Sequence, residues 1–234
     1  MEIEKRRVRI QFAKEGALRY TSHLDLHSLW ERSTRRAGLP LVYSQGFHPQ
    51  PKIQLASALA LGFLSQAELV DLWLEDDGKW QVDELKAKLQ PALPSGIRIL
   101  GVQEVELRSP ALQTLVHTAE YEITLLDEIP ASLVDEKIAA LMDAESIIRE
   151  RRKRRKRKRY TTKKPTYDLR PLIKDLHIIS PVSQGEGAEA SEGIRLFLRV
   201  SASEGATGRP DDVLKEMDIP IEAARVLRTK LIYD

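Results

Sequence analysis

Hydrophobic residues near the start of the chain first follow the period of a strand and then that of a helix. Val8, Ile10 and Phe12 occupy every second position, as in a half-buried β-strand. Ser22 and Asp25 then have the spacing of a helix cap and a first-turn acid. The apolar positions of this helix and its stop residues are Leu26, Leu29, Trp30, Gly38 and Pro40. The pattern predicts a strand followed by a capped helix.

The alternation of strand and helix patterns continues through the first half of the chain. Apolar segments lie around 41–43 and at 53–55, and a strand is predicted at 68–75. A short helix at 82–89 and a strand at 97–107 follow. The order β-α-β-β-α-β is the ferredoxin-like plan.

The second half repeats this order. The predicted elements are a strand at 121–125, a helix at 134–142, a strand from Ile147, a strand at 194–200, a helix at 210–217 and a strand at 225–233. Residues 180–193 are rich in Gly, Ser, Ala and Glu and are predicted to form a loop. We therefore predict an α+β fold of two tandem ferredoxin-like units with antiparallel sheets, at 1–110 and 117–234, joined by a linker at 111–116.

Composition limits the chemistry of this chain. It has no cysteine, which excludes disulfides, thiolate metal sites and cysteine-ligated iron–sulfur clusters within it. No apolar run approaches the length of a membrane span, and the start MEIEKRRVRI does not resemble a signal peptide. We expect a cytoplasmic protein.

The net charge of +2 conceals a strong separation of charge. The basic strip, residues 149–164, holds twelve cations and one acid, Glu150, so the rest of the chain carries −9. Its cationic run consists of Arg151, Arg152, Lys153, Arg154, Arg155, Lys156, Arg157, Lys158 and Arg159. If about six phosphates were neutralised, the affinity for nucleic acid would fall with roughly the fifth power of salt concentration.

Three interpretations of the basic strip remain open. It is a nucleic-acid contact, a solvated loop, or a surface that binds an acidic protein. RNA is favoured over duplex DNA because the sequence has no helix-turn-helix or zinc-finger pattern.

Candidate chemistry gathers between Arg19 and Lys52, which include three of the five histidines. His23 and His27 share a helix face, and Asp25 with His48 would complete a divalent-ion site. That spacing is common, and Leu24 stands where the zinc-peptidase HExxH pattern has glutamate, so we predict no metal.

A second interpretation makes His23 a general acid and base for phosphodiester transfer in RNA, near Tyr20, Ser22 and Lys52. The alternative is that Ser22 and His23 only cap the helix. A third interpretation is phosphate or oligonucleotide binding by the helix start and a glycine turn facing it. Its candidate residues are Arg19, Tyr20, Ser22, His23, Gln45, Gly46, Phe47, His48 and Lys52.

Three motifs carry a resemblance to a known family: RYTSHLDL (19–26), RRAGLP (35–40) and YSQGFHPQPK (43–52). They are similar to an uncharacterised radical-SAM-linked family, a domain of unknown function encoded beside or fused to cobalamin-binding radical SAM proteins. His48 stands where many of those relatives have asparagine. The resemblance implies a separate radical SAM enzyme as partner. S-adenosylmethionine, the iron–sulfur cluster and cobalamin would then belong to that partner, and we expect no cofactor in this chain.

These observations lead to one functional expectation and two alternatives. We expect an RNA-binding accessory protein that works with the radical SAM enzyme in tRNA or rRNA modification. The first alternative is a metal-independent RNA-processing enzyme that uses His23 as general acid and base. The second is a module that binds only proteins.

Overall fold

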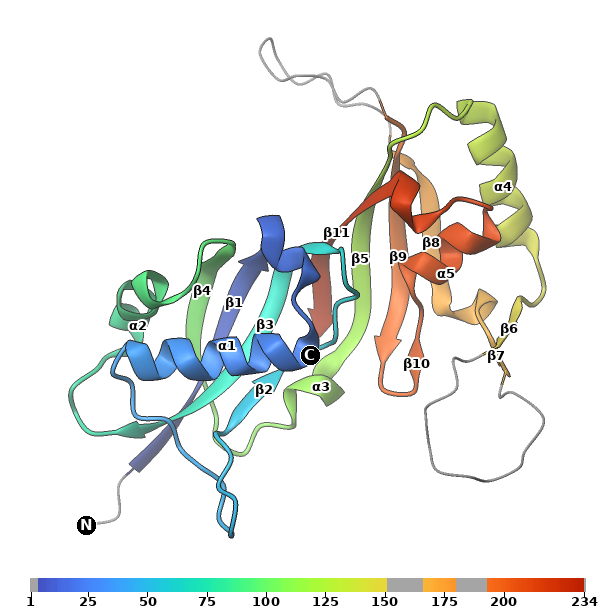
Figure 1. The fold of residues 1–234 in the computed structure, drawn as a ribbon. Helices are drawn as coiled ribbons and strands as arrows, with labels where there is room; N and C mark the ends of the chain where they lie inside the picture. The colour runs from blue at the N-terminus through green and yellow to red at the C-terminus, as the bar shows by residue number, and fades with distance from the viewer. Residues whose placement is uncertain (1–3, 151–165, 180–192, 234) are drawn as a thin grey trace. The chain divides into compact units, whose positions relative to one another are not determined.

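A computed structural model describes residues 4–150, 166–179 and 193–233 of the chain (Figure 1). The chain forms two compact units. Unit 1 consists of Met1–Ala119 and Leu227–Asp234, and unit 2 of Glu120–Val226. The predicted linker was 111–116, whereas the structure divides the chain between Ala119 and Glu120 and returns its last residues to unit 1.

Unit 1 is built on an antiparallel sheet. Its strands are β1 (Glu4–Lys14), β2 (Ile53–Leu55), β3 (Leu64–Asp76), β4 (Ile97–Val105) and the end of β11 (Ala224–Tyr233). The strand order is β11-β3-β1-β4, with β2 also paired to β3. β11 runs parallel to β3, and the other pairs are antiparallel. The helical segments are η1 (Gly16–Tyr20), α1 (His23–Arg36), α2 (Val82–Leu89), η2 (Gln90–Ala92) and α3 (Leu112–Leu115).

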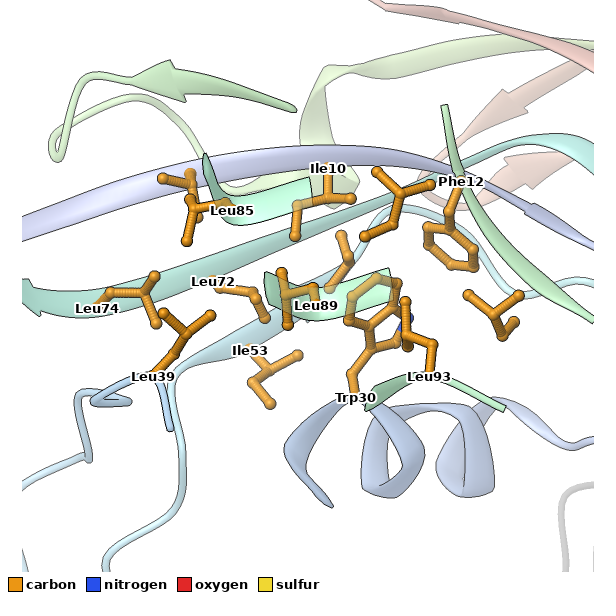
Figure 2. Packing of buried hydrophobic residues seen from close by; sticks show 14 of the residues in the cluster. Ile10, Phe12, Trp30, Leu39, Ile53, Leu72, Leu74, Leu85, Leu89 and Leu93 are labelled. Carbon is orange, nitrogen blue, oxygen red and sulfur yellow. The ribbon is translucent and has the colours of Figure 1, made fainter. Parts of the chain in front are cut away.

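The hydrophobic core of unit 1 lies between one sheet face and the two longer helices (Figure 2). Alternation along β1 and β3 places apolar residues on that face, and the register pairs Val8 with Leu72 and Ile10 with Val70. Trp30 of α1 packs edge-on against Phe12, with ring centroids 4.9 Å apart. Both rings are fully buried, so the predicted helix face is the face that packs.

The opposite side of β1 and β3 carries charge. Asp71 is fully buried between Arg7 and Arg9, which donate to its two carboxylate oxygens at 2.9 Å. Arg7 also donates to the carbonyl oxygens of Ser109 and Pro110, at 2.6 and 2.8 Å. This cluster holds the segment that follows β4 against the sheet.

Unit 2 is also built on paired strands, most of them antiparallel. Its strands are β8 (Ile173–Ile179), β9 (Arg195–Ser203), β10 (Ala206–Thr207), the part of β5 (Val116–Leu125) from Glu120 onward and the start of β11. They follow the order β10-β9-β5-β11, with β8 also paired to β9. The helical segments are α4 (Ala131–Asp143), η3 (Arg170–Leu172), α5 (Pro210–Glu216) and η4 (Ile221–Ala223). A separate ribbon pairs β6 (Ile148–Glu150) with β7 (Thr166–Asp168).

The structure confirms a mixed α+β fold with mostly antiparallel sheets. Two local features were not predicted. Residues 41–43 form only isolated bridges, Leu41 with Leu74 and Tyr43 with Pro51. Strand β8 was not predicted, because its register shifts between Ile173 and Asp175 and its sequence therefore lacks strict alternation. The predicted loop at 180–193 lies outside the described residues except for Gly193.

Within the described ranges, no helix has both the length and the apolar character needed to cross a bilayer.

Candidate functional site

The start of α1 is an ordered cap with an exposed histidine on it. The hydroxyl of Ser22 accepts a hydrogen bond from the backbone N–H of Asp25 at 3.2 Å and donates to its carboxylate at 2.7 Å. This is the predicted cap. His23 is the first residue of the helix, and its side chain is exposed.

Beneath the helix start lies a fully buried lysine. Lys14 ends β1, is 1% exposed, and donates from Nζ to the carbonyl oxygen of Thr21 at 2.9 Å. That bond ties the end of the strand to the residue before the cap. A buried ammonium group requires compensation from nearby charge or a shifted pKa.

The compensating carboxylate comes from β3 and is shared with an arginine of β11. Arg228 donates to Oε1 of Glu68 at 2.9 Å, and the two side chains are 2% and 4% exposed. Arg228 also donates to the carbonyl oxygen of Ala58 at 3.0 Å. Lys14, Glu68 and Arg228 form what we call the buried charged cluster. It holds two cations for one carboxylate and joins β1, β3 and β11.

The electrostatics of the helix start depend on this cluster. Desolvation lowers the pKa of Lys14, and Arg228 lowers it further, whereas Glu68 acts in the opposite direction. Desolvation is also the main reason why the pKa of His23 is lowered; Glu68 opposes it, and His27 and Lys14 add to it. The imidazole of His23 is therefore favoured in its neutral form, which can accept a proton.

The predicted glycine turn is the tip of an exposed hairpin. Gln45, Gly46, Phe47 and His48 are all exposed, and Phe47 has 102% relative accessibility. Gly46 has a φ of 131°, in the region where glycine is favoured. The backbone N–H of Ser44 donates to the carbonyl oxygen of Gln50 at 2.8 Å, which closes the loop.

The helix start and the hairpin lie near different residues of β3, the first near Glu68 and the second beside Trp73. The carbonyl oxygen of Lys52 accepts a bond from the N–H of Trp73 at 3.2 Å, whereas His23 interacts with Glu68. Five residues of strand separate Glu68 from Trp73, which is roughly 16 Å at about 3.3 Å per residue. The structure therefore groups the predicted residues into two places and does not show the turn facing the helix start.

The remaining predicted residues near the helix start are Arg19 and Tyr20. The guanidinium carbon of Arg19 lies 4.8 Å from the ring centroid of Tyr20. The carbonyl oxygen of Arg19 accepts a bond from Gly62 at 2.8 Å, which fixes the backbone there. Among the residues that the structure describes, no group of three or more His, Asp or Glu side chains is placed to hold a metal ion.

The cationic run Arg151–Arg159 lies outside the described residues, but both ends of its segment are defined. Glu150 and Thr166 are partners in the β6–β7 ribbon. Arg149 forms ion pairs with Glu216 and with Asp212, the latter at 3.2 Å. The hydroxyl of Tyr167 donates to Asp212 at 2.6 Å. Desolvation, followed by Asp212, raises the pKa of Tyr167 to about 12. The ribbon is thus anchored to α5.

The buried charged cluster was missed by sequence analysis because Lys14, Glu68 and Arg228 are far apart in the chain. One signal was present. Glu68 shares the strand phase of Val70 and Leu72, so it lies on the buried face. A charged residue in phase with buried positions indicates a paired interior charge or a functional group.

We predict that Glu68→Gln strongly destabilises unit 1. The substitution keeps the shape of the side chain but leaves the buried cations uncompensated, at a cost of about 3–5 kcal/mol. All three tryptophans (Trp30, Trp73 and Trp80) lie in unit 1, so their fluorescence during urea unfolding measures this loss. The control is Glu84→Gln, whose exposed pair with Lys88 should contribute at most about 1 kcal/mol. Equal stability of both variants would contradict the role assigned to the cluster.

We also predict a pH dependence of stability caused by His23. Its pKa is lower in the folded protein than its usual value of 6.5, so in this range the unfolded chain binds more protons. The free energy of unfolding should therefore fall as pH drops from about 7 to about 5, and fall less in His23→Gln. Urea unfolding followed by tryptophan fluorescence at each pH measures the difference. Parallel curves for the two proteins would show that the histidine is not desolvated.

Two solved structures show a weak similarity to this protein. A chain from "Crystal Structure of a Cbf5-Nop10-Gar1 Complex" is 12% identical with a TM-score of 0.46, and the match covers 96% of this protein but 48% of that chain. This protein thus spans about half the length of that chain. The acetolactate synthase small subunit from Thermotoga maritima is 9% identical with a TM-score of 0.26, over 98% and 96% of the two chains. At these TM-scores neither likeness indicates a shared fold.

No curated protein matches the sequence. The model of a family described as "Uncharacterized protein conserved in bacteria (DUF2344)" matches residues 7–210, most of the chain. The protein therefore belongs to this family of uncharacterised bacterial proteins.

Proposed function

We propose that the protein binds RNA and presents it to a separate, cobalamin-type radical SAM enzyme that modifies tRNA or rRNA. The observation that carries the RNA contact is the charge of residues 151–165, which contain eleven cations and no acid. Such a density of positive charge binds phosphate backbones by releasing their counterions.

The surroundings of this segment support the proposal. Its two ends are neighbours in the β6–β7 ribbon, and Arg149 at the base is already paired with acids of α5. Two of these acids, Asp212 and Glu216, are thus engaged by Arg149, and Asp212 also by Tyr167. The cations that follow Glu150 are adjacent in sequence and repel one another, and binding of a polyanion relieves that repulsion.

The partner enzyme is proposed from the motifs at 19–26, 35–40 and 43–52 and their similarity to radical-SAM-linked proteins. The chain has no cysteine, so a cysteine-ligated cluster would belong to the partner. The exposed hairpin tip with Phe47 offers a protruding aromatic group for contact with the partner or with RNA.

Two ferredoxin-like units are the fold that we propose for this function. In unit 1 the order is β2-β3-β1-β4, and in unit 2 it is β8-β9-β5-β11. Each follows the chain order β-α-β-β-α-β, which supports the tandem arrangement.

The proposal predicts RNA binding that depends steeply on salt. Affinity for a tRNA transcript should be measured at several salt concentrations for the native chain and for a variant with Arg151–Arg159 all replaced by glutamine. If about six phosphate contacts are lost, the slope of log K against log salt should fall by roughly 4 to 5. An all-lysine version of the run keeps the charge and should keep most of the slope.

Absent or salt-insensitive RNA binding by the native chain would overturn the proposal. Absence of RNA binding by the native chain, together with loss of an acidic protein partner from the glutamine variant, would instead support a module that binds only proteins. RNase-resistant co-purification of that partner would separate this result from tethering through RNA.

One observation favours a second function, metal-independent RNA processing. His23 is exposed, its pKa is lowered, and it lies within electrostatic range of the buried charged cluster. A neutral imidazole can take the proton of a ribose hydroxyl, and its conjugate acid can protonate the leaving oxygen.

This second function predicts that the isolated chain cleaves RNA in the presence of EDTA. His23→Ala should slow cleavage by about 10²- to 10⁴-fold while the fold and RNA affinity are retained. His27→Ala, one turn further along α1, is the matched control; it removes only a lesser contribution to the pKa of His23 and should cleave at close to the native rate. Intact RNA after prolonged incubation with the native chain would exclude this function.

A further inference from the structure

The sheet of unit 2 has one buried face and one accessible face. Leu196, Leu198 and Val200 of β9 are fully buried, and α4 and α5 lie along one side of this sheet (Figure 1). The intervening residues of β9 point to the opposite face, where Phe197 is only half-buried. Strand geometry thus presents an aromatic ring on the accessible face.

An aromatic pair lies on this face, across two neighbouring strands. His177 of β8 is the register partner of Phe197. The two rings are stacked, with centroids 5.0 Å apart and planes 30° from parallel. The side chain of His177 is 54% exposed, so the pair is accessible. The guanidinium carbon of Arg199 lies over the ring of Phe197, 5.4 Å from its centroid, so the open surface of the pair is on the side of His177.

The charged groups around the pair are balanced by one another. Arg199 is paired with Glu120 at 2.8 Å, and Arg195 is paired with Glu122. Asp175 lies 3.2 Å from His177. This face therefore provides flat groups for stacking without excess positive charge. Attraction of a polyanion to unit 2 comes from a different place, the eleven cations between Glu150 and Thr166.

We infer that the His177–Phe197 pair stacks an unpaired nucleobase, so that the RNA bound by unit 2 is single-stranded where it crosses this face. The inference rests on the proposed RNA function and names the kind of RNA. A base inside a duplex has both faces occupied by its neighbours, whereas an unpaired base can lie on an aromatic side chain. Charge complementarity between the cationic segment and the RNA backbone favours RNA over an apolar protein partner.

Stacking and charge neutralisation respond differently to salt, which makes the inference testable. The probe is a single-stranded 12-nucleotide RNA with one 2-aminopurine, whose fluorescence falls when the base stacks. Its duplex serves as the comparison. Phe197→Leu keeps an apolar side chain without the ring and should weaken single-strand binding by about tenfold, within the range for loss of one stacked base. The factor should be the same at low and high salt.

His177→Ala is a second variant. The side chain of His177 is exposed, so a loss of binding in this variant would not be caused by unfolding. It should weaken single-strand binding severalfold and reduce the quenching of 2-aminopurine. Leu133→Ala, on an exposed position of α4, is the control and should bind as the native chain does. Duplex affinity should change little in any of the three.

The outcomes separate this inference from the function on which it rests. Suppose that Phe197→Leu and His177→Ala both keep the affinity and the quenching of the native chain, while the glutamine variant still loses salt-dependent binding. That result would overturn the stacking site alone. Equal weakening for single strand and duplex would also overturn it. Absence of RNA binding by the native chain would overturn both proposals.

Discussion

The ion pair between Glu68 and Arg228 is the interaction on which the candidate site depends. It joins two strands that are 160 residues apart in the chain, and both side chains are almost completely buried. Removal of Glu68 would leave two buried cations, Lys14 and Arg228, without their carboxylate. Desolvation lowers the pKa of both Lys14 and His23, Glu68 raises both against this larger effect, and Arg228 lowers the pKa of Lys14, so the return of the last strand contributes to the charge balance near the helix start.

The two charged regions differ in how their charge is compensated. Around Asp71 and Glu68 every charged group is buried and bound to a neighbour, so these clusters stabilise unit 1. The cations of residues 151–165 have no acid within their own segment. Charge that is paired internally contributes to structure, whereas a sequence run of like charges favours binding of a polyanion. The proposed function places ligand attraction in the basic strip, and its alternative places proton chemistry at the start of α1.

Patterns that depend on neighbouring residues were predictable from sequence. The alternation of Val8, Ile10 and Phe12 and the cap at Ser22 were recognised because each follows from local geometry. The buried charged cluster was not, since a contact between Glu68 and Arg228 leaves no periodic trace. The hairpin was recognised as a turn, but the distance between Lys52 and His23 is set by the pairing of β3 and could not be obtained from spacing alone.

The return of β11 to unit 1 has a consequence for biosynthesis. Residues 120–226 form unit 2, and Leu227–Asp234 complete unit 1 only afterwards. A ribosome therefore synthesises the whole sequence of unit 2 before Arg228 exists, and until then the nascent first unit has Glu68 and Lys14 without the arginine that pairs with the carboxylate. Unit 2 is in effect an insertion between the first and last parts of unit 1, and a stop codon anywhere within it leaves both units incomplete.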